Sequence, residues 1–233
     1  MLINKDLCIG CGQCVIICPV HAIQLVNEKA KIDREKCVEC AVCYRDSDCP
    51  TKAFKLEKLK WPRIIRNPFS SVVATHKLTG IPGRGTEEMK TNDITERFKQ
   101  SEIGFSIEIG RPGVGAQLGD IEIFTTRLST LGVLYEKDSP VTVILSDNQG
   151  HIEPTLREER VLSAIIEFKI PEHKLNAVLG IIREVDKIVN TVFSVGMIIR
   201  VNQDNAIPLI DVVEKEGFTI QPNAKINIGL GKL

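Results

Sequence analysis

Two cysteine-rich stretches decide the fold of the first quarter of this chain: Cys8-Ile-Gly-Cys11-Gly-Gln-Cys14-Val-Ile-Ile-Cys18-Pro19 and Cys37-Val-Glu-Cys40-Ala-Val-Cys43-Tyr-Arg-Asp-Ser-Asp-Cys49-Pro50. All 8 cysteines of the 233 residues lie in these two blocks. In each block, three cysteines at CxxCxxC spacing are followed by a more distant Cys-Pro pair. This is the ligand pattern of a [4Fe–4S] cluster, in which one tight loop supplies three thiolates and the fourth comes from elsewhere. Two such blocks predict two clusters.

The fourth ligand of each cluster is expected to come from the other block. In two-cluster arrangements the Cys-Pro cysteine of one block reaches the cluster of its neighbour. We therefore assign one cluster to Cys8, Cys11, Cys14 and Cys49, and the second cluster to Cys37, Cys40, Cys43 and Cys18. This exchange ties the two halves together, so loss of one cluster is expected to unfold much of the segment.

Two other uses of clustered cysteines fit this chain less well. A disulfide scaffold requires an oxidising compartment, and residues 1–8 show no apolar run typical of a secretory signal. Zinc sites commonly use paired CxxC or Cys/His sets, which triplets followed by Cys-Pro fit poorly. The blocks also form an internal repeat, because the phrases Cys-Pro-Val-His-Ala-Ile-Gln-Leu and Cys-Pro-Thr-Lys-Ala-Phe-Lys-Leu end them similarly.

On these motifs, residues 1–57 resemble a bacterial-type ferredoxin with two [4Fe–4S] clusters. The resemblance implies transfer of single electrons at low potential between redox enzymes. The chain departs from the usual pattern between Cys43 and Cys49, where five residues replace the usual three. Asp46 and Asp48 in this insertion add negative charge, which is expected to make reduction harder. The alternative is a solvated loop without influence on the cluster.

Composition limits the remaining function classes. Lys plus Arg and Asp plus Glu both total 30, so no global charge favours nucleic acid or a membrane surface. The longest apolar candidate for a membrane span, residues 178–199, is interrupted by charged residues. We therefore expect a cytoplasmic protein, where thiols stay reduced. Residues 55–66 contain one acidic residue and five basic residues: Lys55, Lys58, Lys60, Arg63 and Arg66. This composition is typical of a solvated linker or of a surface for an acidic partner.

Residues 58–100 are predicted to be a basic, Gly-rich linker without regular periodicity. Two Gly/Arg phrases, one in this linker and one after it, suggest a loop site for an anion or other ligand, because glycine lets backbone N–H groups approach an anion and arginine adds bidentate contacts. The candidate residues are Gly83, Arg84, Gly85, Arg111 and Gly113. The alternative is ordinary turn chemistry at an interface between domains.

Residues 101–233 are predicted to form an α+β sandwich. Alternation predicts strands over residues 103–109, 140–145, 161–170 and 191–201, and helical spacing predicts helices over 118–131 and 171–190. A short helix over 207–216 and a strand over 225–230 would follow. The order β-α-β, β-α-β is that of a split βαβ sandwich, the ferredoxin-like or ACT-like architecture. Such modules bind partners or small ligands, or pair into homo-oligomers.

The fold class is therefore α+β, with an N-terminal two-cluster ferredoxin domain, a linker and a sandwich domain. The expected function is an electron-transfer protein or subunit, an oxidoreductase component of anaerobic metabolism that serves a redox partner protein. One alternative is a redox- or ligand-responsive regulator. Another is a self-contained reductase with its pocket in the Gly/Arg loops, although no acid–base set stands out and no catalytic residue is assigned.

Overall fold

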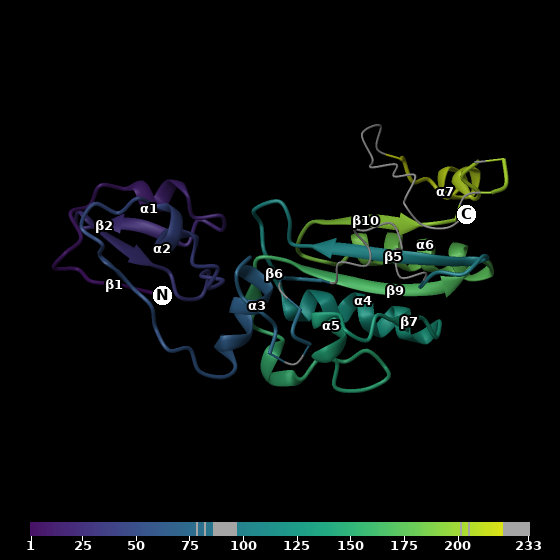
Figure 1. Cartoon of the computed structure of the whole chain (residues 1–233), viewed down its shortest axis with the longest axis horizontal. Helices are drawn as coiled ribbons and strands as arrows, with labels where there is room; N and C mark the ends of the chain where they lie inside the picture. Colours follow the sequence, from purple (N-terminus) through teal and green to yellow (C-terminus); the bar gives the residue numbers. More distant parts are fainter. Residues whose placement is uncertain (78, 82, 86–96, 201, 205, 221–233) are drawn as a thin grey trace.

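The computed structural model describes residues 1–77, 79–81, 83–85, 97–200, 202–204 and 206–220. The chain forms two parts that lie end to end (Figure 1): an N-terminal part, residues 1–57, and a larger C-terminal part that begins at residue 63. Helix α3 (Arg66–Ser70) lies between them. Across the described residues, none of the helices has the length and apolar character needed to cross a membrane.

The N-terminal part is built from short elements in two similar halves. β1 pairs antiparallel with β4, and β2 forms a hairpin with β3. The elements in chain order are β1 (Leu2–Ile3), α1 (Gln13–Ile16), β2 (Ile23–Val26), β3 (Lys29–Ile32), α2 (Val42–Asp46) and β4 (Phe54–Lys55). Its buried core consists mainly of small residues and thiols: Cys8, Cys14, Cys18, Ala22, Ile23, Ala30 and Ala53. Because these residues bury little apolar surface, packing alone stabilises this part weakly.

The C-terminal part contains a four-stranded antiparallel sheet in the order β10-β5-β9-β7. Its main elements are β5 (Glu102–Ile109), α4 (Leu118–Thr130), β7 (Leu134–Tyr135), β9 (Ala164–Pro171), α6 (Leu175–Asp186) and β10 (Phe193–Ile198). The central strands β5 and β9 pair over eight residues, from Glu102 opposite Pro171 to Ile109 opposite Ala164. A smaller pair, β6 (Ala116–Gln117) and β8 (Arg160–Val161), lies beside α3 and α4.

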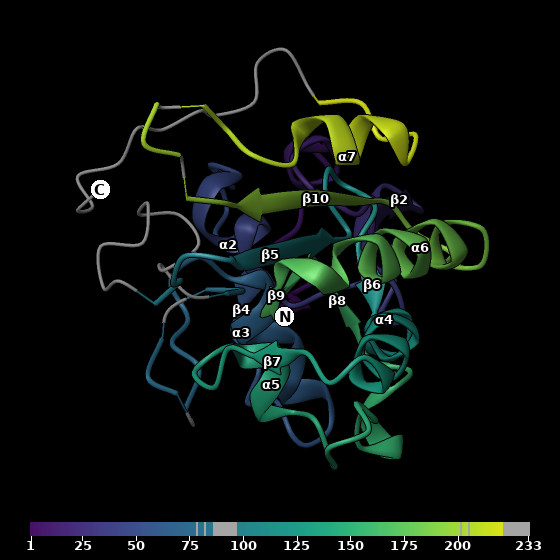
Figure 2. The same ribbon diagram turned by 90° about the vertical axis from the view of Figure 1, so that its right-hand side faces the viewer.

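Two helices cover one face of this sheet. Figure 2 shows α4 and α6 on the same side, and the two helices contact each other. The helix predicted over residues 118–131 is confirmed as α4, which buries Leu118, Ile121, Phe124 and Leu128. The apolar face predicted for the second helix is also confirmed in α6, where Leu175, Val178, Leu179, Ile182 and Val185 are buried. Both faces join the alternate β5 side chains Ile103, Phe105, Ile107 and Ile109 in one core.

The strand predicted over residues 140–145 is wrong. Pro140–Val143 forms a short helix, α5, and Leu145 makes only an isolated bridge with Ile152. The reason is local: Ser139 precedes a proline at the first helical position, where proline's fixed φ and missing N–H suit a helix start. A short apolar run is compatible with a buried helix as well as with a strand, so its periodicity does not distinguish the two. The second strand of the sheet is instead β7.

Element boundaries also differ from the predictions elsewhere in the C-terminal part. Pro171 is the last residue of β9, and a 3-10 helix, Glu172–Lys174, separates it from α6. The strand predicted over 191–201 is confirmed by the shorter β10, and the helix over 207–216 by α7 (Ile210–Lys215). The strand predicted over residues 225–230 lies outside the described residues.

The segment assigned to the linker contributes to the C-terminal part. A 3-10 helix, Arg63–Ile65, leads into α3, and both Ile65 and Phe69 are buried in the main core. The hydroxyl of Ser70 accepts a hydrogen bond from the N–H of Leu162 at 2.9 Å. Residues 63–70 are therefore packed structure, while residues 86–96 of the same segment lie outside the described residues.

The junction between the two parts is polar and centres on Arg66. This side chain is only 4% exposed and forms an ion pair with Glu159 of the C-terminal part. Its guanidinium also donates to the carbonyls of Arg34 (3.3 Å), Glu35 (3.2 Å) and Cys37 (2.8 Å) in the N-terminal part. One buried guanidinium thus donates hydrogen bonds to the loop carbonyls of the N-terminal part and neutralises a carboxylate of the C-terminal part.

We predict that Arg66→Ala lowers the free energy of unfolding by about 3–5 kcal/mol, because it leaves the Glu159 carboxylate and the carbonyls of Arg34 and Glu35 without this partner. The measurement is chemical denaturation of anaerobically purified protein. Arg183→Ala is the matched control: Arg183 pairs with Glu216 at 2.7 Å but is 51% exposed, so its removal should cost at most about 1 kcal/mol. Equal losses in the two variants would contradict the central role of Arg66.

Candidate iron–sulfur centres

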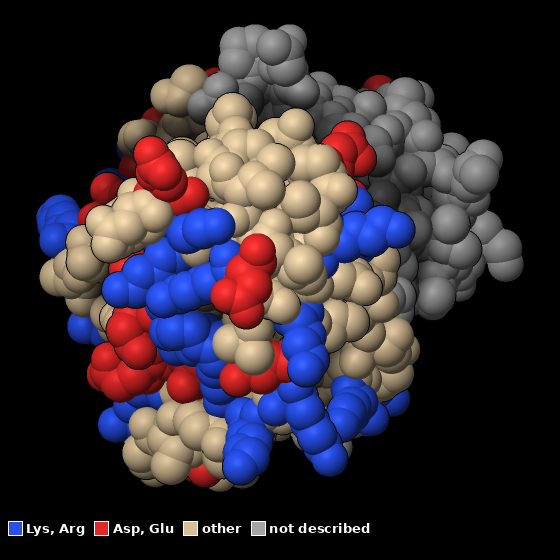
Figure 3. Space-filling view, turned by 90° about the vertical axis from the view of Figure 1, so that its left-hand side faces the viewer, with Lys and Arg blue, Asp and Glu red and all other residues tan. Residues whose placement is uncertain are grey.

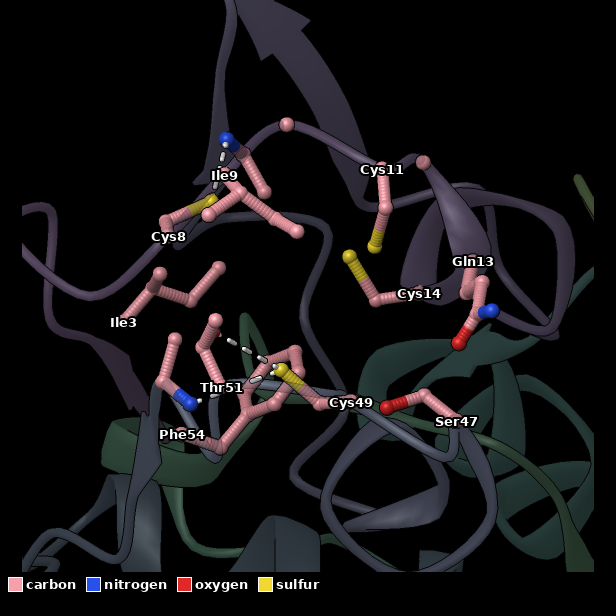
Figure 4. A pocket seen from close by; sticks show the side chains of 14 residues that line it. Ile3, Cys8, Ile9, Cys11, Gln13, Cys14, Ser47, Cys49, Thr51 and Phe54 are labelled. Atoms are coloured by element: carbon pink, nitrogen blue, oxygen red, sulfur yellow. Dashed lines mark hydrogen bonds between the residues drawn. The ribbon is translucent and has the colours of Figure 1, made fainter.

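The eight cysteines line two separate cavities. Cys8, Cys11, Cys14 and Cys49 surround a cavity that is partly open to solvent, which we call the first cavity. Figure 4 shows their sulfur atoms turned toward this common space. Cys18, Cys37, Cys40 and Cys43 line the second cavity, which is also partly open. These are the two groups that the sequence predicts, with Cys18 and Cys49 exchanged between the blocks.

The backbone repeats between the two blocks at the residues that turn each loop. Gly10 and Gly12 have φ angles of 72° and 78°, and their counterparts Glu39 and Ala41 have φ angles of 56° and 59°. This left-handed conformation on either side of Cys11 and of Cys40 turns each loop so that its cysteine side chains can point inward around one cavity. Glycine adopts it freely, whereas Glu39 and Ala41 are strained.

Ion pairs hold Glu39 in this strained conformation. Its buried carboxylate accepts hydrogen bonds from the Met1 ammonium (2.7 Å) and from Arg63 (2.8 Å). Burial acts to raise the pKa of Glu39, but these two cations outweigh it, so the pKa is lowered and the carboxylate stays charged. The side chain of Asn67 also donates to the Glu39 carbonyl at 2.8 Å.

Backbone N–H groups point at several of the sulfur atoms. Ala22 donates to Cys18 at 3.2 Å, and its repeat counterpart Ala53 donates to Cys49 at 3.4 Å. Ala30 on β3 donates to Cys8, also at 3.4 Å. Such donors stabilise negative charge on a thiolate and help to set the potential of a bound cluster.

Four of the cysteine thiols have a pKa above the ordinary value of a cysteine, and one has a pKa below it. Burial is the main cause at Cys14, Cys37, Cys40 and Cys43, and it raises the pKa of Cys43 to about 12 with help from neighbouring thiols. Burial acts in the same direction at Cys49, but hydrogen bonds from Ala53 and Thr51 outweigh it and lower the pKa. Four thiolates around one cavity repel each other, so a bound metal's positive charge is needed to keep them deprotonated.

The residues present fit a [4Fe–4S] cluster in each cavity. Each has four sulfur donors, one for each iron, and its remaining lining is largely apolar. In the described part of the chain, no three His, Cys, Asp or Glu side chains meet closely enough to hold a single metal ion. The sulfurs are instead spread around a cavity wall, which suits a multinuclear cluster.

The insertion before Cys49 is tied back to the second block. The Ser47 hydroxyl donates to the carbonyl of Cys43 at 2.6 Å. Asp46 forms an ion pair with Arg45 at 3.6 Å, and Arg45 donates to the carbonyl of Cys40 at 2.9 Å. Asp48 is exposed. The charge of Asp46 is therefore partly neutralised beside the cavity, while Asp48 remains a solvated group.

The predicted Gly/Arg loop residues come together around a carboxylate of the protein itself. Arg84 and Arg111 both donate to Oε1 of Glu108, at 2.8 and 3.0 Å, and Arg84 also donates to Ser163. Burial and the nearby Arg111 lower the pKa of Arg84. Glu108 was missed by sequence reasoning, although its place in the alternation of residues 103–109 marks it as facing away from the apolar side.

The glycines of these loops have different surroundings. Gly83 and Gly113 have φ angles of 89° and 63°, as turns require. A Cβ at Gly85 would lie 2.9 Å from Ile165, so this loop packs against β9. Arg84 and Arg111, the arginines predicted to bind an external anion, instead form hydrogen bonds with Glu108 of the same chain. A site for an external anion therefore stays a prediction.

Comparison with known proteins supports the iron–sulfur interpretation. Residues 1–24 match the 4Fe-4S binding domain family. Pyruvate synthase subunit PorD of Methanothermobacter marburgensis is 38% identical over 58 residues, which is 25% of this chain and 65% of that protein. A ferredoxin of Pyrobaculum islandicum is 41% identical over 54 residues, 23% of this chain and 49% of the relative.

A third relative is a subunit of the ion-translocating oxidoreductase complex of Methanosarcina acetivorans, 45% identical over 49 residues, 21% of this chain and 18% of that relative. The chain thus spans less than two thirds of each of these relatives. No solved structure matches it. The N-terminal segment is therefore a ferredoxin-type iron–sulfur domain with a general role in electron transfer, and the resemblance predicted for it is confirmed.

Loop strain gives a prediction for three matched substitutions. Gly12→Ala should lower the free energy of unfolding by about 1–2 kcal/mol, because its Cβ meets only Leu25 at 3.9 Å and the cost is the left-handed backbone. Gly10→Ala should cost more and reduce iron content, since its Cβ would lie 2.2 Å from the carbonyl oxygen of Glu28. Ala41→Gly should raise the free energy of unfolding by about 0.5–1 kcal/mol. The relief of backbone strain exceeds the larger conformational entropy that glycine loses on folding.

Anaerobic urea denaturation of the iron-loaded protein measures all three. An Ala41→Gly variant as unstable as Gly12→Ala would show that the two loops do not share this backbone requirement.

Proposed function

We propose that this chain is an electron-transfer protein or subunit that carries low-potential single electrons through two [4Fe–4S] clusters to a partner oxidoreductase. The carrying observation is the sorting of eight cysteines into two cavities within 57 residues. A bound cluster accepts and returns one electron at a time. The names of two relatives, a pyruvate synthase subunit and an oxidoreductase complex subunit, support a role as a subunit.

The residues of the chain have distinct tasks in this proposal. The cysteine thiolates hold the iron, and the N–H donors of Ala22, Ala30 and Ala53 stabilise the additional negative charge of the reduced state. The apolar walls keep water away from most of each site and thereby reduce reorganisation when charge changes. With thiolate ligands only, the expected potential is low, about −400 mV.

For the C-terminal part we propose a split βαβ sandwich, comparable to ferredoxin-like or ACT-like modules, that contacts a partner, a ligand or a second copy of the chain. The strand order β10-β5-β9-β7 with α4 and α6 on one face supports this architecture. The architecture alone does not define a ligand. We propose the cytoplasm as the site of action because free thiolates persist there.

The test is the metal content of anaerobically purified protein and of matched variants. The unaltered chain should hold about eight iron and about eight sulfide, and its visible absorbance should bleach with dithionite. Cys11→Ser and Cys40→Ser each remove one ligand of one cavity and should each lose at least half of the clusters, and more where loss of one cluster unfolds the segment. Ile9→Ala, which changes an exposed lining residue of the first cavity that is not a cysteine, should keep its full content.

Iron and sulfide near zero, or absorbance indifferent to reductant, would refute the electron-transfer proposal. A content of about four iron in the unaltered chain would refute the second cluster only.

A further inference from the structure

The two cysteines that exchange between the cavities stand at the start of matched turns. The N–H of His21 donates to the carbonyl of Cys18 at 3.1 Å, and the N–H of Lys52 donates to the carbonyl of Cys49 at the same distance. His21 and Lys52 both have a left-handed backbone, with φ angles of 50° and 49°. Each Cys-Pro phrase therefore forms the same turn, and the residues after the two prolines occupy equivalent positions.

These equivalent positions carry different chemistry. Val20 lines the second cavity and Thr51 lines the first, and both side chains are half-buried. The hydroxyl of Thr51 lies 3.8 Å from the sulfur of Cys49, within reach of a hydrogen bond to this large atom, and Figure 4 marks the contact. Valine has nearly the same shape as threonine but no hydroxyl, so Val20 offers no such donor to Cys18.

The backbone donors of the two turns are alike, so they do not create this difference. Ala22 and Ala53 occupy matched positions and donate to Cys18 and Cys49 at 3.2 and 3.4 Å. In the thiol form, either atom of the pair between Thr51 and Cys49 can be the donor. A cysteine that binds a metal is a thiolate, which only accepts, so the hydroxyl is then the donor.

We infer that Thr51 is a positioning residue for the electron: its hydroxyl donates to the sulfur of Cys49 and raises the reduction potential of the centre in the first cavity. Val20 gives the second centre no such increase. This inference rests on the proposed function. Reduction adds one negative charge that the sulfur ligands share, so a hydrogen bond to sulfur stabilises the reduced state more than the oxidised state.

The electron balance involves no change in bonding. One electron from a one-electron donor enters the first centre, and the hydroxyl proton stays on Oγ1 of Thr51. Through this hydrogen bond the two centres of a duplicated domain become unequal, and the hydroxyl favours residence of the electron in the first.

Surface charge does not impose a field of one sign on the N-terminal part. Residues 1–57 contain equal numbers of basic and acidic residues. Figure 3, which looks onto this end of the molecule, shows the two signs side by side. Solvated charges of this kind are screened by salt, whereas the hydroxyl of Thr51 acts directly on a ligand atom.

Cations closer to the ligands also differ between the cavities. Lys29 donates to the carbonyl of Cys8, and Arg63 and Arg66 donate to the carbonyl of Cys37. These cations contribute to the absolute potential of each centre. They are unchanged when only a hydroxyl is removed or added, so such a substitution isolates the hydrogen bond.

The experiment is a redox titration of the full-length, iron-loaded protein, with a reduced viologen as electron donor and proton NMR as readout. The shifted β-protons of the cysteines report each centre separately, and proximity to Phe54, which lines the first cavity, identifies its signals. In Thr51→Val, the ratio of reduced to oxidised first centre at a fixed potential should fall about threefold to tenfold, which is about 30–60 mV for one electron. The second centre should keep its potential.

Three further variants keep the test specific to the hydroxyl. Val20→Thr is the reciprocal change and should raise the potential of the second centre alone. Thr51→Ser retains the hydroxyl and should retain the potential of the first centre. Thr130→Val is the matched control: it removes an exposed hydroxyl at the end of α4 and should leave both potentials unaltered. All four variants should hold as much iron as the unaltered protein, since the substitutions barely change volume.

An unaltered first centre in Thr51→Val would overturn the role of Thr51. An equal shift of both centres would do the same, because it marks a general change of structure. Thr51→Ser with the same loss as Thr51→Val would show that the hydroxyl is not the cause. If the unaltered protein holds no reducible iron–sulfur centre, the proposed function fails and the role of Thr51 fails with it. Two reducible centres that are indifferent to Thr51 refute the role of Thr51 alone.

Discussion

The exchange of Cys18 and Cys49 between the two cavities is the constraint on which the N-terminal part depends. Each cysteine follows one loop in sequence but lines the cavity formed by the other loop. The core between the halves contains mainly alanine and cysteine, so it offers little hydrophobic stabilisation. Under the proposed function, metal–thiolate bonds that join both halves would supply what the small core lacks, as in other small metal-dependent domains.

The grouping of the cysteines could be predicted from the sequence because it depends on local spacing. Three thiolates on one loop and a distant Cys-Pro leave few ways to complete a four-iron site. The conformation of the second loop was less visible, since Glu39 and Ala41 replace the glycines of the first. The positive φ angle of Glu39 is held by its contacts with Met1, Arg63 and Asn67, which lie 24 to 38 residues away.

The C-terminal part shows the same division between local and distant information. Helical and strand periodicity identified α4, α6, β5 and β10, because each presents one continuous apolar face to a core. Residues 140–145 were misassigned because an apolar run of that length does not distinguish a strand from a buried helix. The pairing of Arg84 and Arg111 with Glu108 depends on where the loops meet, which composition does not reveal.

Arg66 explains why residues 1–57 are not simply a ferredoxin with an appendage. The loop from Arg34 to Cys37 lies outside the strands and helices, so its carbonyls need partners from elsewhere. Arg66 supplies them and is itself neutralised by Glu159, a residue 93 positions further along the chain. A guanidinium suits this task because its planar fork offers several donors at fixed angles. The similarity to ferredoxins ends near residue 57, but the interactions that hold the second cavity's loop continue into the C-terminal part.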